Sequence, residues 1–130
     1  MSTAPDIQND FSHEIIGAAV EVQRVLGTGL DEGAYAAALA IELAEREIGF
    51  TRDVALSATY KGRSLGEVYR AGFVIEQSVI VELKAVDVLT DLHRAQVLAA
   101  LRLSGLKLGL LINFNVFPVV KGVHRIVSKP

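Results

Sequence analysis

Cysteine is absent from the 130-residue sequence. Without cysteine the chain has no disulfide, no thiolate metal ligand and no cysteine nucleophile, and the composition fits a reducing compartment. The three histidines, His13, His93 and His124, are scattered along the chain. Zinc sites need several nitrogen or sulfur ligands, so a zinc site is not expected.

A large excess of charge of one sign is also missing. The sequence has 13 basic and 15 acidic residues, which give a formal net charge of -2. This balance does not attract nucleic acid over the whole surface. Nucleic acid therefore stays open as a partner but is not indicated by the net charge, and any phosphate binding must come from a local patch.

Long apolar runs are lacking too. The longest stretch without charge is Leu108 to Val120, which contains Asn113, Asn115 and Pro118. It is shorter and more polar than the ~20 apolar residues with which a helix crosses a bilayer. The segment Met1 to Asp10 has no base and no apolar stretch, so it lacks the features of a secretory signal. We expect a soluble, cytoplasmic protein without membrane association.

Apolar side chains are abundant, at 51% of residues against 22% charged. This composition excludes disorder, and the length is that of one domain. We expect one domain over residues 1–130, with residues 1–8 as a flexible tail. The apolar fraction is higher than a monomer of this length needs, so we also expect a homo-oligomer in which a second subunit covers part of the surface.

Hydrophobic periodicity and turn residues divide the chain into helices and strands. Apolar residues three and four positions apart indicate helices, and alternating apolar residues between turn signals indicate strands. The predicted elements are helices over residues 11–26 and 30–48, strands over 54–60, 65–75 and 79–86, a helix over 91–104, and strands over 108–114 and 119–127.

The order ααβββαββ predicts an α/β (α+β) fold. A short connection at residues 76–78 makes the second and third strands antiparallel neighbours. The third and fourth strands are separated by a helix, and a right-handed crossover makes such strands parallel. The sequence therefore predicts a mixed β-sheet flanked by helices.

Glu82 and Lys84 stand two positions apart on a predicted strand, so their side chains leave the same face. Metal-dependent cleavage of a phosphodiester needs carboxylates to hold the metal and a cation near the attacking water or the developing charge. The same alternation is common on ordinary half-exposed strands. Glu32 and Gln96, on two predicted helices, could reach the same pocket, although helical Glu and Gln side chains are most often solvated.

The string from Gly29 to Tyr35 matches the pattern G-x-x-E-x-x-Y through Gly29, Glu32 and Tyr35. The chain resembles the GxxExxY protein family, a branch of the PD-(D/E)XK nuclease superfamily. The likeness continues in order through segments that cover nearly the whole chain: 60–62, 81–86, 93–96, 108–114 and 125–127. The resemblance implies a restriction-endonuclease-like core.

The resemblance also implies roles for particular residues. Glu32 would be the helix-borne carboxylate and a metal ligand, Glu82 a second metal ligand, Lys84 the catalytic base or charge stabiliser, and Gln96 a site residue on a helix. An active enzyme of this kind would use Mg or Mn, whereas an inactive one needs no cofactor. The family's remaining metal-binding aspartate falls at the position of Gly72.

Glycine at this position offers no side-chain oxygen, so the predicted metal site is impaired. A metal would rest on Glu82, Glu32, the carbonyl of Leu83 and water, and the loss of a carboxylate weakens magnesium binding. Glu76 lies on the same side of the strand as Gly72 but ~13 Å further along it.

Replacement acids elsewhere in the sequence are no better placed, since neither Glu67 nor Asp87 has a stronger claim than Glu76. Two functions follow. The chain is either a degenerate nuclease-like protein that acts as a self-associating binding or structural module, or an active Mg- or Mn-dependent nuclease that cleaves DNA or RNA. A small-molecule enzyme has no supporting motif, because the sequence has no phosphate-binding glycine loop and no nucleophile elbow.

Overall fold

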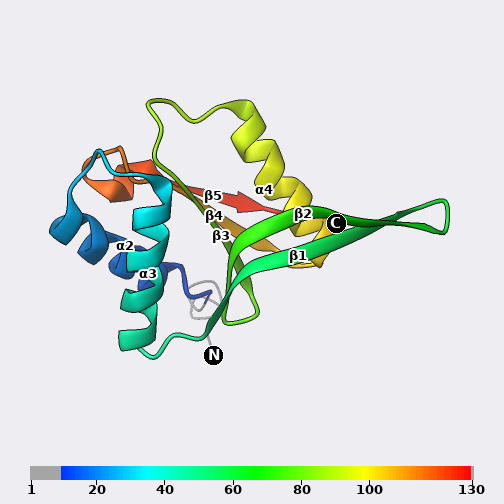
Figure 1. Ribbon diagram of the computed structural model, residues 1–130, viewed down its shortest axis with the longest axis horizontal. Helices are drawn as coiled ribbons and strands as arrows, with labels where there is room; N and C mark the ends of the chain where they lie inside the picture. The colour runs from blue at the N-terminus through cyan, green and yellow to red at the C-terminus, as the bar shows by residue number, and fades with distance from the viewer. Residues whose placement is uncertain (1–9, 130) are drawn as a thin grey trace, which may run out of the picture.

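The computed structural model describes residues 10–129, so the predicted tail at 1–8 lies outside the described residues. Helices and strands follow in the order that the sequence predicts, with one added 3-10 helix, η1 (Figure 1). The elements are α2 (Ser12–Leu26), α3 (Glu32–Glu45), β1 (Phe50–Tyr60), β2 (Arg63–Ile75), β3 (Val79–Lys84), α4 (Asp91–Ser104), β4 (Leu108–Asn113), η1 (Val119–Gly122) and β5 (Val123–Val127).

The five strands form one mixed sheet in the order β1-β2-β3-β4-β5. Within residues 10–129, β3 and β4 are the one parallel pair, with Glu82 opposite Leu111 and Lys84 opposite Asn113. The other neighbouring pairs are antiparallel. The predicted mixed sheet is therefore confirmed, including the parallel pair on either side of α4.

Helices cover the sheet on both faces. Val81 and Leu83 of β3 belong to the large core shared with α2 and α3. Ile80 belongs to a smaller cluster that contains Ala100 and Leu101 of α4. Because successive strand residues point to opposite faces, Glu82 and Lys84 lie on the α4 side, as the alternation predicts.

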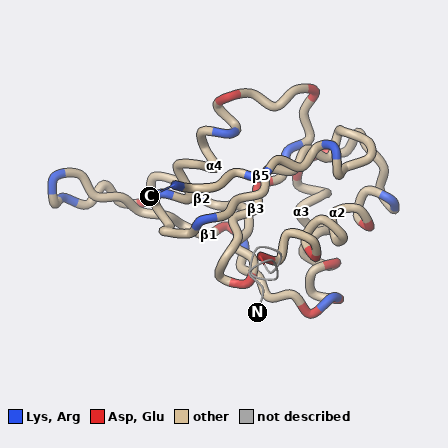
Figure 2. Tube along the Cα trace, turned by 180° about the vertical axis from the view of Figure 1, so that it is seen from behind, with Lys and Arg blue, Asp and Glu red and all other residues tan. Residues whose placement is uncertain are grey.

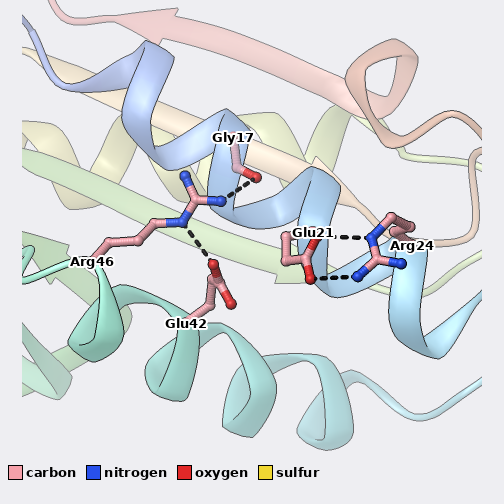
Figure 3. Close-up of polar contacts among 5 residues, drawn as sticks. All are labelled: Gly17, Glu21, Arg24, Glu42 and Arg46. Atoms are coloured by element: carbon pink, nitrogen blue, oxygen red, sulfur yellow. Dashed lines mark hydrogen bonds and ion pairs between the residues drawn. The ribbon is translucent and has the colours of Figure 1, made fainter.

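Polar contacts tie α2 to the end of α3. Figure 3 shows Arg46, which follows α3, donating to the Gly17 carbonyl of α2 at 3.3 Å and to Glu42 at 2.7 Å. The neighbouring pair of Arg24 and Glu21 lies within α2. Exposed ion pairs of this kind each contribute little, about 0–1 kcal/mol, so the buried apolar contacts dominate the packing of α2 on α3.

The end of the chain departs from the prediction. The predicted strand over residues 119–127 is η1 followed by the shorter β5. The Val119 amide donates to the buried Gln23 side chain at 2.8 Å, and Gly122 packs so closely on Asn113 that a Cβ there would lie 2.5 Å from its carbonyl oxygen. These tertiary contacts bend the chain before β5 begins.

The predicted third strand also ends earlier, at Lys84 rather than Val86. Beyond Lys84, the Asn113 side chain takes the backbone hydrogen bonds of Val86 that a neighbouring strand would otherwise take. Asn113 accepts from the Val86 amide at 3.1 Å and donates to the Val86 carbonyl at 2.9 Å. Other boundaries shift by a few residues: α3 ends at Glu45 rather than Ile48, and β1 starts at Phe50 rather than Val54.

The hairpin of β1 and β2 projects from the rest of the fold (Figures 1 and 2). β2 pairs with β3 only from Phe73 to Ile75, so residues 63–72 have β1 as their one partner strand within the described chain. We call the part formed by residues 54–72 the ribbon. Within residues 10–129, the structure has no helix with the length and apolar character of a membrane span.

Candidate metal-nuclease site

Glu82 lies where β2 and β3 separate. Pairing between these strands runs from Ile75 opposite Val79 to Phe73 opposite Val81, and the next residues are Gly72 and Glu82. The Glu82 side chain is buried, with only 9% of the residue exposed. Its Oε2 atom accepts two hydrogen bonds from β2, from the Tyr69 hydroxyl at 3.0 Å and from the Gly72 amide at 3.1 Å.

Burial is the main cause of the pKa shifts of Glu82 and Tyr69. Desolvation raises the pKa of Glu82, against the lowering effects of the two hydrogen bonds and of the Lys84 charge, and the nearby Glu32 charge raises it further. Burial also raises the pKa of Tyr69, together with the negative charge and the hydrogen bond of Glu82. The Tyr69 hydroxyl therefore keeps its proton and acts as a hydrogen-bond donor.

Glu32 is the first residue of α3 and is exposed. It borders the same pocket as Gly72 and Glu82, a hollow of about 190 Å³. The structure thus brings Glu32 and Glu82 to one pocket. Gly72, where the resemblance implies an aspartate, borders the same pocket.

The turn before α3 places Glu32 there. The Tyr35 hydroxyl donates to the Gly27 carbonyl at 2.7 Å and accepts from the Leu30 amide at 3.2 Å. Gly29 has a φ of 97°, a conformation that glycine adopts without strain, and its amide donates to the Asn115 side chain at 3.3 Å. The G-x-x-E-x-x-Y string therefore shapes the turn from which α3 starts.

Lys84 and Gln96 lie outside this pocket. Lys84 is half-buried, one step beyond Glu82 on the same face of β3, and within residues 10–129 it forms no ion pair. Its charge nevertheless acts on Glu82. Gln96 is half-buried on α4 and does not border the pocket that Glu32 and Glu82 share.

Asp53 is a pocket residue that the sequence did not point to. It lies across from Gly72, between the pairs of Arg52 with Phe73 and of Val54 with Ala71, and it has a φ of 53°. It borders the same pocket as Gly72 and Glu82. Alternation predicted a strand only from Val54 onward, and only the register of β1 against β2 brings Asp53 to this place.

A family model of the PD-(D/E)XK nuclease superfamily matches residues 9–126. The chain belongs to this superfamily. The mixed sheet flanked by helices agrees with a restriction-endonuclease-like fold. Neither the curated proteins nor the solved structures contain a significant match.

Nucleases of the PD-(D/E)XK superfamily generally use Mg or Mn. In this chain, residues 10–129 contain no group of three or more Asp, Glu, His or Cys side chains placed to hold a metal. One oxygen of Glu82 already accepts two hydrogen bonds from β2. The side chains as arranged therefore do not fit the metal centre of a superfamily nuclease.

Proposed function

We propose that this chain is a degenerate PD-(D/E)XK nuclease-like protein of the GxxExxY branch, with weak or no catalysis, that acts as a self-associating binding or structural module. In this proposal residues 1–130 form one domain, and the cysteine-free composition supports a cytoplasmic location. The observation that carries the proposal is Gly72, which borders the pocket beside the buried Glu82 where the resemblance implies an acid.

The ligand preferences of magnesium explain why a glycine at position 72 weakens the metal site. Magnesium requires near-octahedral oxygen ligands and is held by carboxylates that keep their charge. Position 72 supplies no side-chain oxygen, and burial raises the pKa of Glu82, which disfavours its charged form. Glu32 is exposed at the start of α3, and an exposed carboxylate is a weak anchor for a dication.

The ribbon supports the self-association part of the proposal. Tyr60, Leu65 and Val68 expose 62%, 56% and 47% of their surfaces. β1 is an edge strand, and residues 63–72 of β2 have a second free edge within the described chain. Two-stranded ribbons are marginally stable alone, and exposed strand edges pair readily with another chain. A second copy would cover both the edges and the apolar side chains.

A second candidate is an active Mg- or Mn-dependent nuclease that cleaves DNA or RNA. Asp53 favours it, because this carboxylate borders the pocket beside Gly72. If Asp53 compensates for the missing acid, the natural protein cleaves nucleic acid, and Asp53→Asn as well as Lys84→Ala abolish the cleavage.

The experiment compares the wild type with Gly72→Asp and Gly72→Asn in Mn²⁺-dependent cleavage of labelled DNA and RNA. The asparagine variant is the matched control, because it has nearly the same size without the charge. We expect cleavage by Gly72→Asp alone, and loss of that cleavage in the double variant with Lys84→Ala. Lys84-dependent cleavage by the wild type at a rate like that of Gly72→Asp would contradict the proposal and identify an active enzyme.

A further inference from the structure

Gly72 is not a glycine for backbone reasons. Its φ is outside the left-handed region that favours glycine, so the chain conformation accepts any L-residue there. The restriction comes from space. A Cβ at position 72 would lie 3.1 Å from Oε1 of Glu82 and 3.4 Å from the Val81 carbonyl oxygen. The position of the Glu82 carboxyl group is therefore what leaves little room for a side chain.

The Glu82 carboxyl group is held there by β2. Its Oε2 atom accepts from both the Tyr69 hydroxyl and the Gly72 amide, and Oε1 faces the place of the missing side chain. A buried carboxyl group needs hydrogen-bond donors, since leaving it without partners is costly. These two donors satisfy a group that a metal ion would otherwise neutralise.

Packing fixes the Tyr69 donor in place. Tyr69 is opposite Leu56 in the ribbon. Both side chains pack against the cluster that includes Ala100 and Leu101 of α4. Tyr69 is half-buried and packs against this cluster, which limits the freedom of its ring. From this position its hydroxyl donates to Glu82.

We infer that Tyr69 is a positioning residue whose hydroxyl holds the Glu82 carboxyl group against β2, a contact that we call the lock. The lock depends on the glycine at position 72, because a side chain there would crowd the carboxyl group. The inference rests on the proposed function, that of an impaired metal site, and explains how that site is stable without a metal. The glycine leaves space beside β2, and the Tyr69 hydroxyl and the Gly72 amide hold the Glu82 carboxyl group in that space. An acid restored at position 72 must then push Glu82 away against the Tyr69 hydrogen bond.

The lock predicts how Mn²⁺ affinity depends on Tyr69. Hydrogen bonds to a carboxylate that must break on binding lower affinity by about tenfold or more. The double variant Tyr69→Phe/Gly72→Asp should bind Mn²⁺ about tenfold or more tightly than Gly72→Asp. Tyr60→Phe/Gly72→Asp is the matched control, because Tyr60 lies on the same hairpin, is exposed and does not contact Glu82. Isothermal titration calorimetry measures all three affinities.

The outcomes separate the inference from the proposed function. Equal Mn²⁺ affinity in the Tyr69→Phe and Tyr60→Phe double variants, or no binding by either, would overturn the lock and leave the proposed function standing. Mn²⁺-dependent cleavage by the wild type at a rate like that of Gly72→Asp would overturn the proposed function, and the lock would then be tested by the single variants Tyr69→Phe and Tyr60→Phe. Tighter binding by Tyr69→Phe than by Tyr60→Phe would still support it.

The single variants also serve if Gly72→Asp does not fold. On the natural Gly72 background, weak Mn²⁺ binding is read from paramagnetic broadening of the Gly72 amide signal at millimolar Mn²⁺. Broadening at lower Mn²⁺ concentration in Tyr69→Phe than in Tyr60→Phe supports the lock. The same concentration dependence in both variants would overturn it.

Discussion

The Tyr35 hydroxyl donates to the Gly27 carbonyl at 2.7 Å and so joins the first turn of α3 to the end of α2. It also accepts from the Leu30 amide at 3.2 Å. The Tyr35 ring is fully buried and stacks on Phe114 with ring centroids 4.6 Å apart. One side chain thus fixes the turn before Glu32 and connects it to the end of β4.

Removal of this hydroxyl should weaken the fold. We expect Tyr35→Phe to lower the free energy of unfolding by about 1–2 kcal/mol, because the Gly27 carbonyl and the Leu30 amide lose a partner while the ring stacking is kept. Urea denaturation followed by circular dichroism measures the loss. Tyr60→Phe, on the exposed hairpin tip, is the control and should change the value by less than about 0.5 kcal/mol. Equal losses in the two variants would refute this role of the hydroxyl.

Gln23 should be among the most sensitive polar positions. It is 4% exposed, and its side chain donates to the Phe114 and Val116 carbonyls and accepts from the Val119 amide. Gln23→Leu leaves these three backbone groups without that partner, so we expect a loss of about 3 kcal/mol or more in the free energy of unfolding. Gln96→Leu, half-buried on α4, is the matched control with a change of about 0.5 kcal/mol or less. A small effect of Gln23→Leu in thermal or urea unfolding would contradict the prediction.

The raised pKa of Glu82 gives the fold a pH dependence. The folded state holds the proton of this carboxyl group to higher pH than the unfolded state, whose pKa is near 4.5. The contribution of Glu82 to stability is therefore complete below pH 4.5 and is lost as the pH rises through the raised pKa. Glu82→Gln cannot ionise, so its stability relative to the wild type should increase from acid to neutral pH. Parallel stability curves in a pH series of urea denaturations would show that Glu82 does not titrate in this way.

Self-association through the ribbon should be sensitive to charge. Leu65→Lys places a cation on an exposed apolar position of β2, and we expect it to weaken the dimer by about tenfold or more. Val88→Lys adds the same charge at a residue that is 71% exposed and outside the ribbon, and it should leave the dimer unchanged. Sedimentation or light scattering over a concentration series measures the effect. A wild type that stays monomeric at high concentration would exclude the proposed self-association.

Sequence patterns predicted those parts of the fold that depend on local periodicity. The helix from Ser12 to Leu26 and the buried strand β4 lie within a residue or so of their expected bounds, because their apolar spacing matches the core that they enter. The strand boundaries at Val86 and Val119 were wrong. In both places a side chain distant in sequence, Asn113 or Gln23, takes the backbone hydrogen bonds that a sheet ladder would have taken.

The candidate site shows the same division. The family resemblance selected Glu32, Gly72 and Glu82 as site positions, and the structure brings all three to one pocket. The sequence did not predict Asp53 as a pocket residue, because only the register between β1 and β2 places it across from Gly72. The Tyr69 contact with Glu82 was also unforeseen, since it depends on the separation of β2 from β3 after Phe73.

The amino-acid sequence by itself determined the order of elements, the parallel pair around α4 and the superfamily, because periodicity, turn residues and motif order are all written along the chain. Only the tertiary structure determined which groups donate hydrogen bonds to the Glu82 carboxyl group. The hydrogen bonds of a buried carboxyl group depend on which donors the fold brings within about 3 Å, and Tyr69 and Gly72 reach it from a neighbouring strand that no local pattern positions.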